Sequence, residues 1–392
     1  MTHLSAVILA AGSGKRFKPL VTSKPLIPVG GKTLLEWIVS DLQVFGIEKL
    51  VIVVPKKNKE VVAKLLPQAK IVVQEKPEGM GMAGAMLAVV DLAGPTVVIN
   101  GDDLIDPAIF KAFLDQVGKS PEKIVLTGFK TESDLPGGYL EVKDNQVVGI
   151  IEKPGAGQRP SDYLNLVLHY FPKIEELVKH LKSVKSESDD AYEQALNEGL
   201  KHAPAVLVKA EGYFQPLKYP HHLLDITALV LAKRLDPEKL IDPSVKIMEG
   251  AVVKNSYLGP NVVIGNNCLV RDSIIEAGSV VGFNTEIARS YVGPKSWFHS
   301  NYVGDSVVEG ESNMGSGARL ANWRFDGQSV GLKLKDKVID SGKTKLGVIM
   351  AKGVKLGINA SIMPGVTLGE KAIVGSGLVI NRAVEPSEVV VK

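Results

Sequence analysis

The sequence predicts a Rossmann-like α/β domain with a mostly parallel sheet, followed by a left-handed parallel β-helix of hexapeptide repeats. Two observations predict this order. Up to about residue 235, apolar runs alternate with amphipathic stretches, which is typical of strand–helix units. After residue 240, apolar residues and glycines recur at every sixth position, which is typical of a β-helix. We therefore expect domains at 1–235 and 241–392, with a linking helix at about 220–235.

The first domain shows five apolar runs and four helical patterns. The runs predict buried strands at 4–10, 49–54, 71–73, 97–100 and 124–128. The amphipathic stretches between them predict helices at 33–45, 59–66, 83–92 and 109–117. Active sites of such sheets lie beyond the carboxyl ends of the strands. We expect the site near residues 10–14, 74–81 and 100–103.

The last third repeats with a period of six residues. One apolar series comprises Val252, Leu258, Ile264 and Val270, and continues with Leu356, Ile362, Leu368, Val374 and Ile380. A second series comprises Val354, Ala360, Val366, Ala372 and Leu378. This period fits a triangular coil whose flat sides are short strands, whereas a β-sandwich would alternate with a period of two. Residues 316–345 interrupt the period and predict a projecting loop.

The composition excludes several classes of function. Lys and Arg total 46 and Asp and Glu total 43, and the basic residues are dispersed. Nucleic-acid binding needs a concentrated basic surface, so we expect none. Cys268 is the single cysteine, which excludes an intramolecular disulfide. The apolar run at 4–11 is too short to span a bilayer. We expect a cytoplasmic protein without membrane contact.

The loop after the first strand has the residues of a polyphosphate site. Gly12 and Gly14 allow backbone N–H groups to approach phosphates, and Lys15, Arg16 and Lys24 offset their charge.

Two common phosphate-binding motifs fail on their spacing. A Walker A loop would need glycine where Leu26 stands. The dinucleotide fingerprint would need glycine where Phe17 stands. The loop therefore belongs to neither class.

The stretch from Leu9 to Trp37 reads LAAGSGKRFKPL, then SKPLIPVGGKTLLEW. It resembles the start of the sugar-1-phosphate nucleotidyltransferase family. The resemblance implies that a sugar-1-phosphate oxygen attacks the α-phosphorus of UTP or dTTP and releases pyrophosphate. It implies nucleotide contacts at Ala10, Ala11, Gly12, Gly14, Lys15, Gln74, Gly79 and Gly81, and catalytic roles for Arg16, Lys24 and Asp102. Asp102 would bind Mg²⁺, and the sugar phosphate would contact Gly138, Glu152, Lys153 and Asn165.

One family position differs. The family has a second metal-binding Asp near the end of this domain, where this sequence has Pro216. No carboxylate replaces it locally, although Glu211 or Asp225 could reach the site from nearby in the sequence. The substitution predicts weaker metal binding or loss of nucleotidyl transfer.

A second resemblance lies in the β-helix. The segment Phe298–Ser306, FHSNYVGDS, resembles the archaeal-type bifunctional enzymes that join N-acetylglucosamine-1-phosphate uridylyltransferase and glucosamine-1-phosphate acetyltransferase. The resemblance implies that His299 is the general base for attack of a sugar amine on acetyl-CoA. It implies substrate contacts at Arg289, Tyr302 and Asn322, and a homotrimer formed through the β-helix.

Three hypotheses follow from the sequence. The leading one is a bifunctional enzyme of UDP-N-acetylglucosamine or related nucleotide-sugar synthesis. The second is a monofunctional glucose-1-phosphate uridylyl- or thymidylyltransferase with a structural β-helix. The third is a non-catalytic regulatory subunit that binds nucleotide sugars, which Pro216 favours and the four charged residues Arg16, Lys24, Asp102 and Lys153 disfavour.

Overall fold

The computed structural model describes residues 4–75, 81–132, 135–155, 157–184, 186, 190–334 and 336–391. It forms two compact units that do not follow the order of the chain. The first comprises Met1–Ser13 and Leu35–Phe214, and the second comprises Gly14–Leu34 and Gln215–Lys392. Within the described residues, no helix combines the length and the apolar composition needed to cross a bilayer.

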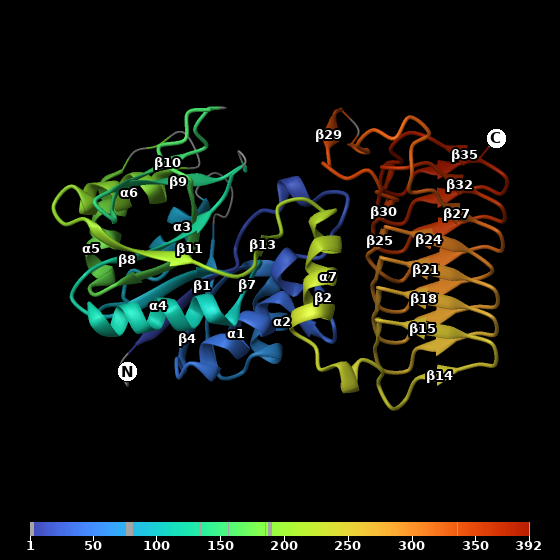
Figure 1. Cartoon of the computed structure of the whole chain (residues 1–392), viewed down its shortest axis with the longest axis horizontal. Helices are drawn as coiled ribbons and strands as arrows, with labels where there is room; N and C mark the ends of the chain where they lie inside the picture. The colour runs from blue at the N-terminus through green and yellow to red at the C-terminus, as the bar shows by residue number, and fades with distance from the viewer. Residues whose placement is uncertain are drawn as a thin grey trace. The chain divides into compact units, whose positions relative to one another are not determined.

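The first unit contains a nine-stranded sheet (Figure 1). Its order is β5 (Lys70–Gln74), β4 (Lys49–Pro55), β1 (Ser5–Leu9), β6 (Thr96–Asn100), β11 (Tyr163–Phe171), β8 (Val125–Lys130), β12 (Ala205–Ala210), β10 (Gln146–Glu152) and β9 (Gly138–Lys143). The four strands from β5 to β6 are parallel, as the alternating pattern predicts. Beyond β6 the sheet is mixed, because β11 runs antiparallel to both of its neighbours.

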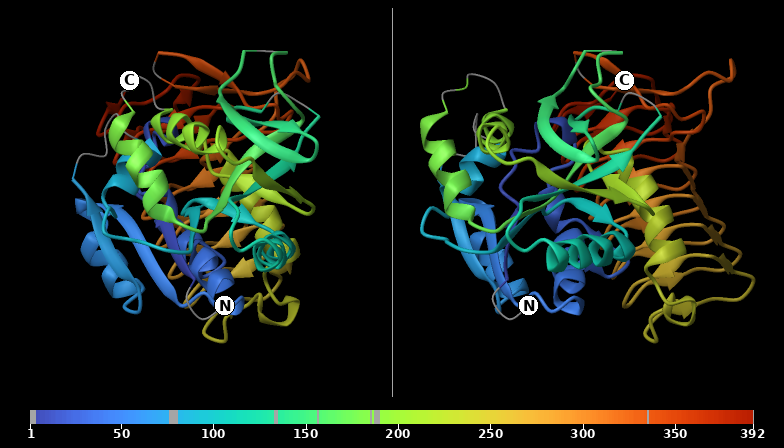
Figure 2. Two further views of the ribbon diagram at one scale, coloured as in Figure 1. Left: turned by 90° about the vertical axis from the view of Figure 1, so that its left-hand side faces the viewer. Right: turned by 60° about the vertical axis from the view of Figure 1, so that its left-hand side comes forward.

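Six helices belong to this part of the fold: α1 (Leu34–Val44), α2 (Lys59–Leu65), α3 (Gly81–Leu87), α4 (Pro107–Lys119), α5 (Ile174–Ser183) and α6 (Ala191–Leu200). Helix α3 ends at Leu87, earlier than the predicted 92. Helix α4 begins where the Asp106 carboxylate accepts a hydrogen bond from the Ala108 N–H at 2.9 Å, with Pro107 at the first helical position. Helices α5 and α6 pack side by side (Figure 2).

The second unit is built on a β-helix with three parallel sheets, here named by their first strands. The β14 face contains β14 (Lys246–Ile247), β17 (Val263–Ile264), β20 (Val280–Val281), β23 (Trp297–Phe298), β26 (Asn313–Met314), β31 (Lys355–Leu356), β34 (Ile373–Val374) and β36 (Val389–Val390). The β15 face contains β15 (Val252–Lys254), β18 (Leu269–Arg271), β21 (Glu286–Ala288), β24 (Tyr302–Gly304), β27 (Arg319–Leu320), β32 (Ser361–Ile362) and β35 (Val379–Ile380). The β16 face contains β16 (Tyr257–Leu258), β19 (Ile274–Ile275), β22 (Tyr291–Val292), β25 (Val307–Val308), β30 (Ile349–Met350) and β33 (Thr367–Leu368). The repeat predicted from the sequence is therefore confirmed.

The predicted register is wrong at one residue of the first coil. Val252 is 43% exposed, and its neighbour Val253 faces the core and pairs with Val270. Equivalent residues of the early coils lie 17 positions apart, so one side of each coil is a residue shorter than the others. Other coils have a spacing of 16, and a later one has a spacing of 18. A strict period of six therefore predicts a core position at Val252, one residue before the actual one at Val253.

Two other segments complete this unit. The predicted projecting loop leaves the coil after Leu320 and contains the antiparallel pair β28 (Gly331–Lys333) and β29 (Val338–Asp340). The predicted linking helix is α7 (His222–Lys233). The segment Gly14–Leu34, which contains β2 (Pro28–Val29) and β3 (Lys32–Thr33), and α7 lie against the β16 face. The outward side chains of Ile274, Tyr291 and Val307 are buried for this reason.

Candidate active sites

The carboxyl ends of β1 and β6 lie side by side in the first unit. Leu9 pairs with Asn100, and the Gly101 N–H donates to the Leu9 carbonyl at 2.9 Å. A Cβ on Gly101 would lie 3.1 Å from the Cβ of Ala10, so glycine permits this close approach. The register therefore brings the predicted nucleotide-binding residues Ala10 and Ala11 next to Asp102. This edge of the sheet is where the sequence predicts the site.

Asp102 is the predicted metal ligand, and it is half-buried in the turn after β6. The Asn100 amide donates to the neighbouring Asp103 carboxylate at 3.0 Å, which steadies this turn. Among the residues that the structure describes, no three His, Cys, Asp or Glu side chains gather as a metal-binding group. Mg²⁺ fits one carboxylate when substrate phosphates and water supply its other ligands, so Asp102 is compatible with such a site.

The two carboxylates considered as substitutes for the missing second Asp lie elsewhere. Asp225 belongs to helix α7 and forms an ion pair with Lys343, with 2.5 Å between Oδ1 and Nζ. Glu211 follows β12 and is exposed. In the part of the chain that is described, neither joins Asp102 in a metal-binding group.

The glycine and lysine loop is divided between the two units. Gly12 belongs to the first unit, and a Cβ there would meet open space. Gly14 adopts a left-handed conformation with φ of 65° and opens a short 3-10 helix at Lys15–Phe17. Lys15 and Arg16 are exposed. Lys24, in the 3-10 helix Lys24–Leu26, lies over the Phe17 ring with 5.9 Å between Nζ and the ring centroid.

The predicted nucleotide contacts at Gln74, Gly79 and Gly81 are described only in part. Gln74 ends strand β5 and is buried. Gly81 begins helix α3 with a φ of 43°. Gly79 lies outside the described residues.

The four residues predicted to bind the sugar phosphate converge at the ends of β9, β10 and β11. Gly138 pairs directly with Glu152, and the next pair on β9 places Tyr139 opposite Leu164, next to Asn165. A Cβ on Gly138 would lie 2.8 Å from Glu152 Oε2, so glycine leaves room for that carboxylate. The register thus collects on one edge residues that span the sequence from 138 to 165.

Lys153 holds an uncommon backbone conformation at this edge. Its φ is 48°, a left-handed value that costs a non-glycine residue free energy and is often found at functional sites. Its ammonium group lies 2.9 Å from Glu152 Oε1. Half of the Lys153 side chain is exposed, which leaves the cation accessible to an anionic group.

Asn165 connects to two buried residues that the sequence did not single out. Its Oδ1 lies 2.9 Å from Nε2 of His169, and Nδ1 of His169 lies 2.9 Å from the Tyr192 hydroxyl. Burial lowers the pKa of His169 to about 3 and raises that of Tyr192 well above its usual value. Both groups are therefore neutral at physiological pH.

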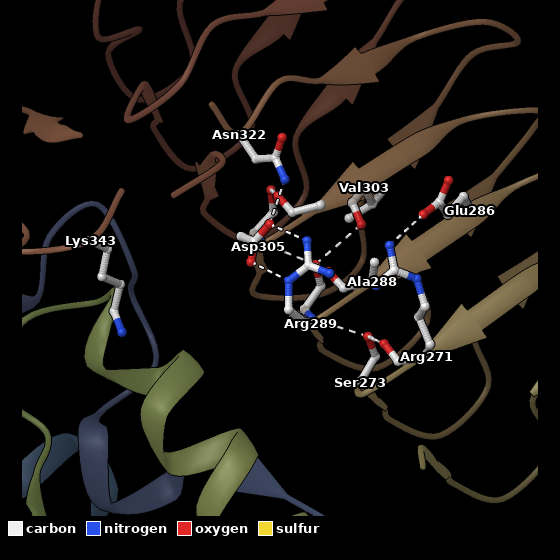
Figure 3. Close-up of polar contacts among 12 residues, drawn as sticks. Arg271, Ser273, Glu286, Ala288, Arg289, Val303, Asp305, Asn322 and Lys343 are labelled. Carbon is white, nitrogen blue, oxygen red and sulfur yellow. Dashed lines mark hydrogen bonds and ion pairs between the residues drawn. The ribbon is translucent and has the colours of Figure 1, made fainter. Parts of the chain in front are cut away.

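In the β-helix, Arg289 and Asn322 meet at a carboxylate. Arg289 binds Asp305 through two hydrogen bonds of 2.7 Å, and the Asn322 amide donates to the same carboxylate (Figure 3). Such a bidentate pair fixes the plane of the guanidinium. Asp305 belongs to the FHSNYVGDS segment, which is the signal that would have identified it. The substrate predicted to contact Arg289 must therefore share this cation with Asp305.

Tyr302 and Asn322 approach each other over Gly304. A Cβ on Gly304 would lie 2.5 Å from the Tyr302 hydroxyl and 2.7 Å from the Asn322 amide nitrogen. His299 is exposed, and its ring stacks on Trp297 with 6.3 Å between centroids. Within the described chain, His299 makes no hydrogen bond with Arg289, Tyr302 or Asn322. Hydrogen bonds to Asp305 and the close approach over Gly304 therefore link Arg289, Tyr302 and Asn322.

Two buried glutamates of the β-helix hold the segment that contains Lys24, which belongs to the same unit. Glu309 accepts hydrogen bonds from the N–H groups of Val21 at 2.9 Å and Thr22 at 2.6 Å. Glu276 accepts from Gly30 at 2.8 Å and Gly31 at 3.4 Å. These contacts fix both ends of residues 21–31 against the β16 face. A sequence pattern does not reveal them, because the partners lie 245 to 288 residues apart.

Comparison with known proteins identifies the family. The family model described as Nucleotidyl transferase matches residues 5–213. The chain belongs to the nucleotidyl transferase family. It is 33% identical to the bifunctional protein GlmU of Methanococcus maripaludis over 99% of this chain and 97% of that protein. It is 31% identical to a bifunctional sugar-1-phosphate nucleotidylyltransferase/acetyltransferase of Sulfurisphaera tokodaii over 97% of this chain and 98% of that one.

The fold of this nucleotidyl transferase also matches a solved structure. A Bacillus anthracis protein assigned as a glucose-1-phosphate thymidylyltransferase superposes with a TM-score of 0.52 and 22% identity. The match covers 59% of this chain and 96% of the other. At this identity, the likeness shows a shared fold only.

Proposed function

We propose that this nucleotidyl transferase transfers a nucleotidyl group from UTP or dTTP to a sugar-1-phosphate and releases pyrophosphate. The observation that carries the proposal is the convergence of Gly138, Glu152, Lys153 and Asn165 at one edge of the sheet. A second edge, where Ala10 and Ala11 lie beside Asp102, adds a place for the nucleotide. The full-length similarity to bifunctional relatives supports the same activity.

The reaction requires charge neutralisation and alignment rather than a covalent protein nucleophile. The sugar-1-phosphate oxygen forms a bond to the α-phosphorus while the bond to the β-phosphate oxygen breaks, and pyrophosphate leaves with that electron pair. Lys15, Arg16 and Lys24 neutralise the triphosphate, and Lys153 binds the sugar phosphate. Glu152 and Asn165 orient the sugar through its hydroxyl groups.

A divalent metal, which we propose to be Mg²⁺, would be held by Asp102 together with the substrate phosphates. It would withdraw charge from the phosphate oxygens. The chain replaces the usual second metal-binding Asp with Pro216, so its metal affinity would depend strongly on the bound nucleotide.

The proposed second activity is acetylation of glucosamine-1-phosphate. His299 would accept a proton from the sugar amine as the amine attacks the acetyl carbonyl of acetyl-CoA, and coenzyme A would leave as the thiol. Tyr302 and Asn322 would contact the sugar phosphate and amine, and Arg289 would contact the phosphate. Since His299 makes no hydrogen bond with these residues within the described chain, we propose that a homotrimer formed by the β-helix supplies the complete site.

Pyrophosphate release tests the first activity. Wild-type protein is offered UTP or dTTP with glucose-1-phosphate or N-acetylglucosamine-1-phosphate and Mg²⁺. We expect the wild type to release pyrophosphate with at least one pair. Asp102→Ala should release it at least a hundredfold more slowly, since removing such a group usually costs about 10² in rate. The exposed control Asp91→Ala should release it at the wild-type rate. Silence of the wild type with every pair contradicts the proposal and favours a regulatory subunit.

Thiol release from acetyl-CoA tests the second activity. We expect His299→Ala to abolish thiol release with glucosamine-1-phosphate while pyrophosphate release continues. His202→Ala, at an exposed histidine of the first unit, is the matched control. Absence of thiol release from the wild type would leave a nucleotidyltransferase with a structural β-helix.

A further inference from the structure

The carboxamide of Asn165 is tied to a buried chain of hydrogen bonds between strand β11 and helix α6. His169 lies four residues after Asn165 on the strand and is 0% exposed. Tyr192, at the start of α6, is 1% exposed, and its ring stacks on His169 with 5.9 Å between centroids. This packing holds the imidazole between a hydroxyl and an amide.

The direction of these hydrogen bonds follows from the number of hydrogens available. His169 is neutral, so one ring nitrogen donates and the other accepts. Within the described residues, Nδ1 of His169 is the only hydrogen-bond partner of the Tyr192 hydroxyl. If the hydroxyl accepted from Nδ1, its own hydrogen would be buried without an acceptor. Tyr192 therefore donates to Nδ1, and Nε2–H of His169 donates to Asn165 Oδ1.

This direction determines which end of the Asn165 amide meets a ligand. Its Oδ1 is occupied as an acceptor, so Nδ2 is the end that remains. No described group accepts a hydrogen bond from Nδ2. Asn165 is half-buried beside Gly138 and Glu152, and the hydroxyl and phosphate oxygens of a sugar-1-phosphate accept hydrogen bonds from such a donor.

We propose that His169, held by Tyr192, is a positioning residue that fixes the Asn165 amide with its nitrogen toward the sugar-1-phosphate. The inference rests on the proposed function and adds two residues that do not touch the substrate. Without His169 and Tyr192, the Asn165 amide would rotate freely. Half of its orientations would then place Oδ1, instead of Nδ2, against the oxygens of the ligand. Preorganisation of the amide lowers the free energy lost on binding.

Tyr192→Phe tests the proposal, because it removes the donor that selects the His169 tautomer and keeps the ring. We expect KM for the sugar-1-phosphate to rise about three- to tenfold, the usual worth of one hydrogen bond, with kcat little changed. Tyr170→Phe is the matched control. It removes another buried hydroxyl of the same sheet, which donates to the Pro121 carbonyl at 2.6 Å, and it should leave this KM unchanged.

A second measurement reads the tautomer without activity. ¹⁵N NMR of the wild type should show His169 with Nε2 protonated and Nδ1 unprotonated, with the signal assigned by its loss in His169→Gln. The positioning role is overturned if Tyr192→Phe has the same KM as Tyr170→Phe, or if the His169 ring is protonated at Nδ1. A wild type without pyrophosphate release instead refutes the proposed function, and the positioning role with it.

Discussion

Replacing Glu276 by glutamine tests how a buried carboxylate of the β-helix links stability to pH. Glu276 is 3% exposed and accepts two backbone hydrogen bonds from Gly30 and Gly31. Burial raises its pKa from 4.5 to about 7, and the two backbone hydrogen bonds only partly oppose this. Two tyrosines nearby, Tyr257 and Tyr291, have pKa values raised by burial and stay neutral over the same range.

The sign of the effect follows from the pKa of Glu276 in the two states. Below pH 4.5 the carboxyl group is protonated in both states and costs nothing. Between pH 4.5 and about 7 the unfolded chain loses this proton while the folded chain keeps it, so the free energy of unfolding falls as pH rises. Above pH 7 the loss is complete. At about 1.4 kcal/mol per pKa unit, it amounts to roughly 3 kcal/mol.

Glu276→Gln keeps the shape and the accepting oxygen but does not titrate. We expect the variant to match the wild type near pH 4.5 and to exceed its free energy of unfolding by about 3 kcal/mol at pH 8. Urea denaturation between pH 4.5 and 8.5 measures both curves, and Glu249→Gln, at an exposed position, is the control. Parallel curves for the wild type and Glu276→Gln would refute the reasoning.

Three further substitutions test the candidate sites. Gly138→Ala places a Cβ 2.8 Å from Glu152 Oε2, and we expect KM for the sugar-1-phosphate to rise about tenfold or more in steady-state pyrophosphate release, since small displacements of binding groups are costly. An unchanged KM would exclude Glu152 from the site. Gly304→Ala places a Cβ 2.5 Å from the Tyr302 hydroxyl, and thiol release from acetyl-CoA should fall while pyrophosphate release persists. Asp305→Asn removes the charge that pairs with Arg289, and the free energy of unfolding should fall by about 1–3 kcal/mol in urea denaturation. If Asp305→Asn had the same free energy of unfolding as the wild type, water would satisfy Arg289 as well as the Asp305 carboxylate does.

The parallel part of the sheet was predictable because its strands are buried on both faces. Runs such as the one at 49–54 are continuously apolar, and the structure places a strand at Lys49–Pro55. Strands β9 to β12 and helices α5 and α6 were not predicted. Strand β9 reads GYLEVK, which mixes polar and apolar residues because only part of it is buried. Local pattern is weak where burial is partial.

The β-helix was predictable from its period, and its register was not. The core column that contains Leu258, Ile264 and Val270 is buried as expected. A coil of 17 residues has one side that is a residue shorter than the other two. A strict period of six therefore predicts that Val252 faces the core, whereas the structure places Val253 there. Only the pairing between coils reveals which side is shorter.

Some residues of the candidate sites were also predictable from the sequence, and others were not. Gly138, Glu152, Lys153 and Asn165 were predicted from the sequence because motif residues retain their order along the chain, and the strand register brings these four together. His169 and Tyr192 have no motif, and their relation to Asn165 depends on the packing of α6 on β11. Glu276 and Glu309 resemble surface glutamates in the sequence, and their burial depends on a segment from the opposite end of the chain.

We propose that the chain binds a nucleoside triphosphate with a metal held by Asp102, and calorimetric titration measures this binding directly. UTP and dTTP are titrated into wild-type protein with Mg²⁺ and again with EDTA. We expect saturable binding of at least one nucleotide, one per chain, that weakens when Mg²⁺ is removed. In Asp102→Ala, binding should no longer depend on Mg²⁺. The absence of binding by the wild type in the presence of Mg²⁺, for both nucleotides, would contradict it.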